Sequence, residues 1–232
     1  EIGHIQLTEK GLFFTNCIDG DLSRMAIWLK TGLEKPRQVT PSRFNVRTKV
    51  HEYGGQPYIV VKNHVYFVNY ADQAVYCQPI EKVEFGADQK SEPRLITIPN
   101  SGFRYADFIY DAKRDHLICV REDHGDQDSL ESAASKVSNC IVSLPNGEAI
   151  VTEGEILFSE SDFVSSPTLS ADASTLAFIW WDHPNMPWDM TTLAVASLTE
   201  DGYFSEVSHV QGPCPASILQ PRFNGDRQLY VI

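Results

Sequence analysis

The chain has 232 residues, of which 42% are hydrophobic and 22% are charged, and its formal net charge is −12. This balance is typical of a globular protein with a buried core. The acidic surface argues against nucleic acid as a partner, because phosphate binding requires a basic face. No run of about 18 apolar residues occurs, so the sequence predicts no membrane span and no membrane partner.

The start of the chain and the cysteines bear on the cellular compartment. Residues 1–6 have neither a basic nor an apolar stretch and do not resemble a signal peptide. The five cysteines are odd in number and form no Cys-x-x-Cys pair. Several lie in apolar, strand-like segments, where a free thiol behaves as a small hydrophobic group. We therefore expect free thiols and a reducing, cytoplasmic location.

Short apolar strands recur along the chain at a nearly regular interval. They are centred on Phe13, Tyr66, Ile118, Ala177 and Tyr230. The intervals between these centres are 53, 52, 59 and 53 residues. A polar turn precedes each of them, and another strand precedes the later turns, so each repeat contains a hairpin.

The repeat also predicts where the individual strands lie. The first, innermost strand of each later repeat is expected at 53–61, 105–110, 166–169 and 221–223. The outer strands are expected at 74–79, 94–98, 138–144, 149–152, 191–197 and 204–210. No stretch keeps helical apolar spacing over three turns. About four strands in each period of about 50 residues is the pattern of a propeller blade.

The predicted fold is therefore all-β: a β-propeller of four-stranded antiparallel blades, with about four and a half blades in residues 1–232. The fifth blade is expected to end after its second strand, with 228–232 unpaired. The upstream strand of the first blade is expected to be absent or short. Because open strand edges recruit other strands, we expect an edge-mediated dimer.

Three segments carry more specific motifs. The first contains Val50-His51-Glu52-Tyr53-Gly54-Gly55, the second covers 104–124, and the third runs over 165–189 and includes Trp181-Asp182-His183-Pro184. Together they resemble the N-terminal propeller of prolyl oligopeptidase family serine peptidases, in the dipeptidyl-peptidase and acylaminoacyl-peptidase branch. The phrase Ser-Pro-x-Leu-Ser-x-Asp at 166–172 is also shared with propellers of the TolB type.

The resemblance implies a two-part enzyme in which the propeller caps an α/β-hydrolase domain and admits only short peptides. That domain would carry a Ser-Asp-His triad, with the serine in a Gly-x-Ser-x-Gly turn. This sequence contains no Gly-x-Ser-x-Gly. We therefore predict no catalytic residue and no activity for the chain by itself, and we expect a downstream hydrolase domain as its partner.

Two segments hold the candidate substrate-binding residues. His51, Glu52 and Tyr53 are expected at the start of an innermost strand, beside glycines that let a ligand approach the backbone. Alternation also places Arg47 and Lys49 on the same face as His51. The structural alternative is that Tyr53 packs and the glycines permit a bend.

The second segment is the loop at 182–189, which two prolines stiffen. It exposes Trp188 and Asp189 for recognition of an apolar group or a partner domain. The structural alternative is that Trp188 packs over the edge of its blade.

Other classes of site find less support. The acidic run at 122–128 lacks the ligand offsets of a calcium loop, and no histidine pair has zinc-site spacing. We therefore predict no cofactor and no metal. A free-standing propeller of the TolB or kelch kind, binding a protein or a small ligand, is the alternative function.

Overall fold

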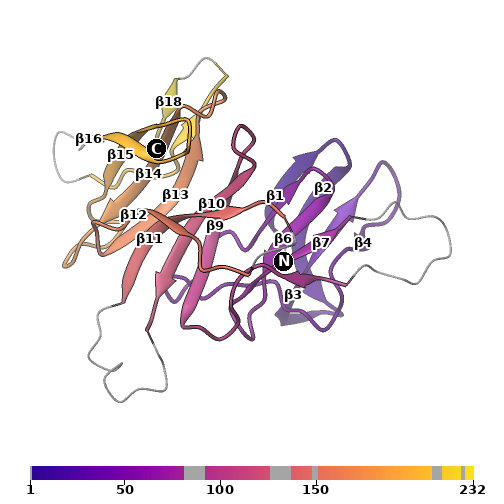
Figure 1. Cartoon of the computed structure of the whole chain (residues 1–232). Helices are drawn as coiled ribbons and strands as arrows, with labels where there is room; N and C mark the ends of the chain where they lie inside the picture. The colour runs from indigo at the N-terminus through magenta and orange to yellow at the C-terminus, as the bar shows by residue number, and fades with distance from the viewer. Residues whose placement is uncertain (1, 81–91, 126–136, 148–150, 211–215, 226–227) are drawn as a thin grey trace. The chain divides into compact units, whose positions relative to one another are not determined.

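The computed structural model describes residues 2–80, 92–125, 137–147, 151–210, 216–225 and 228–232 (Figure 1). Within these residues the chain is all-β, with antiparallel sheets and no helix. Accordingly, this part of the chain holds no helix long and apolar enough to cross a membrane.

The strands form four four-stranded sheets and one hairpin, each paired in chain order. The first sheet holds β1 (Gly3–Thr8), β2 (Gly11–Ile18), β3 (Asp21–Lys30) and β4 (Arg37–Gln38). The second holds β5 (Tyr58–Val61), β6 (His64–Val68), β7 (Val75–Pro79) and β8 (Arg94–Leu95). The third holds β9 (Phe103–Asp111), β10 (His116–Asp123), β11 (Ser138–Pro145) and β12 (Glu155–Phe158). The fourth holds β13 (Phe163–Leu169), β14 (Thr175–Trp181), β15 (Thr192–Leu198) and β16 (Phe204–Val210), and the hairpin joins β17 (Arg222–Phe223) to β18 (Leu229–Tyr230).

This topology confirms the predicted fold class. Each sheet is an antiparallel meander of four strands, which is the form of a propeller blade. The hairpin supplies the half blade.

Two strands differ from the sequence prediction. The strand expected at 53–61 begins only at Tyr58, because residues 51–53 form a turn. The outer strand expected at 149–152 lies at Glu155–Phe158 instead, after a turn in which Gly154 has φ +88°. Residues 149 and 150 of that expected strand lie outside the described residues.

The edges of the chain also differ from expectation. The first sheet has a full upstream strand, since β1 is six residues long and pairs with β2. At the other end, the backbone of Ile232 is not unpaired, because it exchanges two hydrogen bonds of 2.8 and 2.9 Å with Leu219. The edge-mediated dimer stays an untested prediction.

The described chain divides into two compact units. Unit 1 comprises residues 1–106 and 147–152, and unit 2 comprises 107–146 and 153–232. In unit 1 a core cluster joins the first two sheets through buried side chains such as Phe13, Tyr58 and Phe67. In unit 2 the fourth sheet has its own cluster, where Phe163 stacks on Trp181 with ring centroids 5.3 Å apart.

The burial of the strands explains why the repeat is visible in the sequence. All four residues of β5 and four of the five residues of β6 are buried. A strand covered on both faces reads as a continuous apolar run rather than an alternating one. These runs are the recurring apolar phrases of the sequence. Four cysteines, Cys17, Cys77, Cys119 and Cys140, are free thiols as predicted, and Cys214 lies outside the described residues.

Antiparallel pairing places specific segments at the same end of each sheet. In a four-stranded meander the start of the first strand and the turn between the second and third strands lie at one end. For the second sheet these segments are 46–57 and the β6–β7 turn at 69–74. For the fourth sheet the loop 182–191, between β14 and β15, occupies the corresponding end. Both candidate segments therefore lie at this end of their own sheets.

Candidate functional site

The segment before β5 alternates strictly between buried and outward-facing residues. Val46, Thr48 and Val50 are buried, whereas Arg47 and Lys49 are not. This period of two is that of an extended chain with one covered face. Arg47 and Lys49 lie on one face as predicted, but the alternation ends at Val50 and His51 lies in a turn, so the predicted face does not continue to His51.

The alternation ends in a tight turn at residues 50–54. The backbone N–H of Glu52 donates to Lys49 O at 2.9 Å, and that of Gly54 donates to Val50 O at 2.8 Å. His51 and Glu52 have φ values of +54° and +66°, and Gly54 has +87°. A Cβ at Gly54 would lie 3.0 Å from Thr48 O. The glycine is therefore required by the turn itself.

The turn directs Glu52 toward an arginine. The Glu52 carboxylate lies 2.6 Å from Nη1 of Arg104, and the same nitrogen donates to Lys49 O at 3.0 Å. The Arg104 side chain is 13% exposed and that of Glu52 is 77% exposed. The carboxylate predicted to meet a ligand thus already has a cationic partner within unit 1.

Tyr53 is 65% exposed, and its ring lies 5.7 Å from that of His51 between centroids. Of the structural alternative, the bend at the glycines is present, whereas Tyr53 is not buried. The two predicted residues present adjacent rings on the outside of the turn.

Two cations share one aromatic ring beside the turn. The Arg47 guanidinium carbon lies 5.2 Å and Lys49 Nζ lies 4.6 Å from the centroid of the Tyr70 ring. Tyr70 belongs to the β6–β7 turn. In that turn the buried Gln73 donates to Tyr70 O and accepts the N–H of Lys49, both at 2.8 Å. No sequence pattern points to Tyr70, because only folding brings the two segments together.

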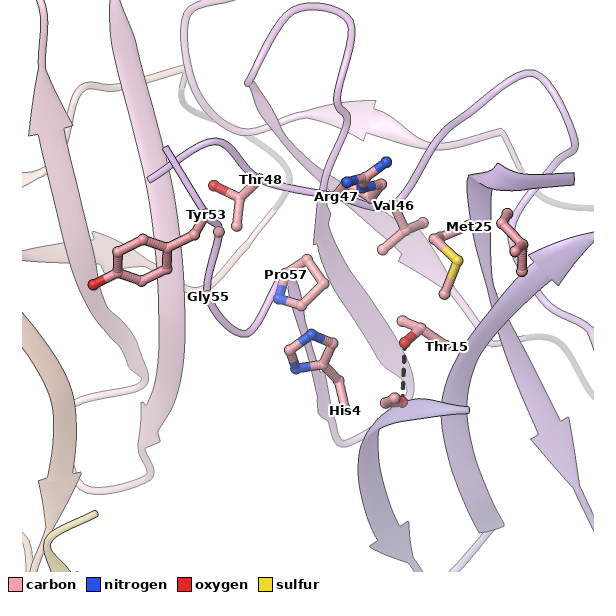
Figure 2. A pocket seen from close by; sticks show the side chains of 12 residues that line it. His4, Thr15, Met25, Val46, Arg47, Thr48, Tyr53, Gly55 and Pro57 are labelled. Atoms are coloured by element: carbon pink, nitrogen blue, oxygen red, sulfur yellow. Dashed lines mark hydrogen bonds between the residues drawn. The ribbon is translucent and has the colours of Figure 1, made fainter. Parts of the chain in front are cut away.

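A cavity of about 330 Å³ adjoins the turn (Figure 2). Its lining comes from β1 to β3 and from residues 46–57, and includes His4, Arg47 and Tyr53. Figure 2 shows the Tyr53 ring pointing away from His4 and Thr15. Below the cavity the Tyr58 hydroxyl donates to His4 O, and burial raises the pKa of this phenol far above its usual range. It stays protonated at neutral pH and holds β1 against β5.

The second candidate segment is the β14–β15 loop of unit 2. The Asp189 carboxylate accepts the backbone N–H of Met186 at 3.1 Å, and the Asp189 N–H donates to Met186 O at 2.9 Å. Asp189 therefore closes its own loop. Trp188 is 65% exposed, so most of its surface faces solvent, and its role in binding stays a prediction.

The acidic run at 122–128 is described only as far as Gly125. There the buried Glu122 lies 2.8 Å from Nε2 of His124. No group of three or more potential metal ligands occurs among the described residues.

Comparison with solved structures shows that this fold is similar to part of two peptidase structures. The chain superposes on a Mycobacterium tuberculosis puromycin-hydrolysing peptidase with a TM-score of 0.85 and 26% sequence identity, covering 100% of this chain and 35% of that one. For a structure of puromycin hydrolase the TM-score is 0.84 and the identity 24%, with 99% of this chain and 35% of that chain covered. The chain thus spans about a third of the length of these proteins.

These neighbours belong to the prolyl oligopeptidase family, and their N-terminal part is a β-propeller. The resemblance predicted from the sequence motifs is therefore confirmed: this chain has the fold of that propeller.

The propeller fold also occurs outside peptidases. A nidogen/laminin complex structure matches with a TM-score of 0.59 and 11% identity, over 99% of this chain and 71% of that one. At this identity the likeness concerns the fold alone. No family model matches the chain, and the search of curated proteins also finds no match.

Proposed function

We propose that this chain is the non-catalytic, substrate-gating propeller of a serine peptidase that acts on short peptides, of aminopeptidase or acylaminoacyl-peptidase type. The observation that carries the proposal is the similarity over the full chain to about a third of a puromycin-hydrolysing peptidase. The other 65% of that protein includes a catalytic domain. A hydrolase domain is therefore the partner that this proposal requires.

The residues of the chain support a non-catalytic role for the propeller, with catalysis in a separate hydrolase domain. Acyl transfer needs an activated nucleophile, a base and an oxyanion hole held together. The sequence has no Gly-x-Ser-x-Gly turn to supply the first of these. The propeller's part is steric, because a narrow passage admits a short peptide and excludes a folded chain.

The proposed contact residues are the exposed rings and their neighbours at the site end of each sheet. They are His51, Glu52, Tyr53, Trp188 and Asp189. Tyr53 and Trp188 offer large apolar surfaces at low cost in side-chain entropy. Glu52 and Asp189 hold the two segments in shape through Arg104 and Met186.

The proposal is tested by activity with and without a hydrolase domain. Residues 1–232 alone should not turn over aminoacyl or acylaminoacyl chromogenic substrates. The full gene product should cleave short peptides and leave unfolded polypeptides intact. Turnover by purified 1–232, or a gene product without a hydrolase domain, contradicts the proposal and favours the free-standing binding propeller.

A substitution pair tests the contact residues in the same assay. Trp188→Ala should raise KM for a short peptide several-fold, with kcat nearly unchanged. The control is Leu33→Ala, which removes a large apolar side chain that is fully exposed and lies outside both candidate segments. Equal KM values in the two variants would remove Trp188 from the site.

A further inference from the structure

Arg47 and Lys49 form a positive cluster on a protein whose net charge is −12. Within the part of the chain that the structure describes, neither side chain has a carboxylate partner. The nearest acid along the chain, Glu52, pairs with Arg104 instead. Two cations without counter-charges at one place favour an anionic ligand.

The Arg47 guanidinium is accessible from solvent and is held in place by neighbouring groups. Arg47 is exposed and lines the 330 Å³ cavity. The Tyr70 ring lies against its guanidinium, and one nitrogen donates a long bond of 3.4 Å to Ser23 O. The remaining N–H groups of the planar fork are available for a bidentate partner.

The backbone of the turn argues for the kind of anion. A phosphate site of the nest type uses several backbone N–H groups that point at the ligand. Here the N–H groups of Lys49, Val50, Glu52 and Gly54 all donate within the protein. With these four N–H groups engaged, the Arg47 fork is the donor that remains, and its two parallel N–H groups match the two oxygens of a carboxylate.

The cavity has room for the end of a peptide. Its volume lies at the lower end of the range of about 300 to 1,000 Å³ for small-molecule sites. Gly54 and Gly55 line it without side chains, and the exposed Tyr53 ring stands at its side. A main chain can approach such glycines closely.

We propose that this cavity binds the C-terminal carboxylate of a short peptide, with Arg47 as the bidentate anchor and Lys49 adding positive potential. This inference rests on the proposed function, because it names the end of the substrate that the propeller holds. It adds Arg47, Lys49 and Tyr70 to the candidate residues.

The test is a binding measurement that needs no turnover. Trialanine and trialanine amide are titrated into the protein by isothermal calorimetry at low salt. Trialanine should bind more tightly than the amide by about tenfold to a hundredfold, which is the range expected for a charge-assisted hydrogen-bonded pair. Arg47→Gln should abolish this preference. Arg47→Lys, which keeps the charge but loses the fork, should retain only part of it.

Arg43→Gln is the matched control. Arg43 is an exposed arginine of unit 1 whose guanidinium lies 4.8 Å from the centroid of the Phe44 ring, but it pairs with Glu92 and does not line the cavity. This variant should bind trialanine like the unchanged protein. Thermal unfolding of all variants checks that the fold is intact.

The outcomes separate this inference from the proposed function. Equal binding of peptide and amide, no binding at all, or equal losses in the Arg47 and Arg43 variants overturns the inference, even if the full gene product is a peptidase. Carboxylate-specific binding that depends on Arg47 upholds the site. If the gene product then hydrolyses no peptide, only the proposed function fails.

Discussion

The two units join neighbouring sheets by different means. In unit 1 the amide of Gln6, on β1, pairs with the backbone of Val60 on β5. The Val60 N–H donates to Oε1 at 2.8 Å, and Nε2 donates to Val60 O at 2.9 Å. The bond from the Tyr58 hydroxyl to His4 O adds a second link between the same strands. All of these groups are neutral.

In unit 2 a buried arginine joins two neighbouring sheets. Arg114, in the β9–β10 turn, lies 2.5 Å from the Asp111 carboxylate, and the two side chains are only 7% and 2% exposed. The same guanidinium donates to Ala173 O at 3.0 Å and Thr199 O at 2.6 Å, which belong to turns of the fourth sheet. Arg114 therefore joins the third and fourth sheets through its hydrogen bonds to Ala173 O and Thr199 O, while its ion pair with Asp111 lies within the third sheet.

The contacts between neighbouring sheets therefore differ in how much stability is lost when one side chain is removed. A neutral amide that is removed leaves two unsatisfied backbone groups, whereas an arginine that is removed leaves a buried carboxylate without its counter-charge. The second loss costs more, because charge is harder to bury than an amide.

The largest expected effect follows from removing that arginine. Arg114→Met should destabilise unit 2 by about 3 to 5 kcal/mol, the range for breaking a buried ion pair. Hydrogen exchange read by mass spectrometry should show faster exchange in β9 to β16 and little change in β1 to β8. Adding Asp111→Asn should recover part of the loss, because no uncompensated charge then remains.

Lys113→Met is the control for this prediction. Lys113 precedes Arg114 and pairs with Glu200 at 2.9 Å, but at the surface. Exposed pairs contribute little, so exchange should hardly change. Similar exchange in the Lys113 and Arg114 variants would show that burial of the pair is irrelevant.

A smaller effect is expected in unit 1. Gln6→Met should destabilise this unit by about 2 kcal/mol, because the polar groups of the buried Val60 lose their partners. Denaturant unfolding, followed by exchange in β1 and β5, measures the change. Gln38→Met is the comparison, since that amide donates to Thr40 O and Ser42 Oγ, which are nearby in the chain. If Gln38→Met lowers the free energy of unfolding as much as Gln6→Met does, the bonds of Gln6 between the two sheets add no more stability than a local hydrogen bond.

The smallest effect concerns thiol reactivity. Burial raises the pKa of both Cys119 and Cys140 in unit 2, which lowers their thiolate fraction at pH 8 and slows alkylation. The half-buried Cys17 of unit 1 should react with iodoacetamide first. Arg114→Met should speed labelling of Cys119 and Cys140 but not of Cys77. Mass spectrometry of labelled peptides gives the order, and uniform acceleration would mean that the units do not open separately.

The sequence predicted the number of sheets because the repeat arises from strands buried on both faces, such as β6. It misplaced β12 because Val151 and Thr152 are β-branched and favour a strand. The structure instead uses Glu155–Phe158, whose first two residues are exposed. Short, exposed edge strands carry too little apolar pattern to be found this way.

The candidate site was predictable only in part. The alternation that exposes Arg47 and Lys49 can be predicted from the local sequence. Tyr70 could not be predicted to join them, because it belongs to the separate β6–β7 turn. The positive φ values of His51 and Glu52 have no signature in residue type, since both are L-residues that rarely adopt them. A strand was therefore predicted where a turn occurs. The role of Arg114 was missed for a similar reason: Ala173 and Thr199 lie far along the chain.

The bonds made by Gln73 have a consequence for the kinetics of recognition. Since Gln73 fixes the backbone of Lys49 and Tyr70, the loop that carries Arg47 is ordered before a ligand arrives. Only the Arg47 side chain then loses rotamer entropy, about 0.5 to 1.5 kcal/mol. Encounter, rather than rearrangement, would limit association. The observed rate in stopped-flow mixing should then rise linearly with peptide concentration and reach no plateau.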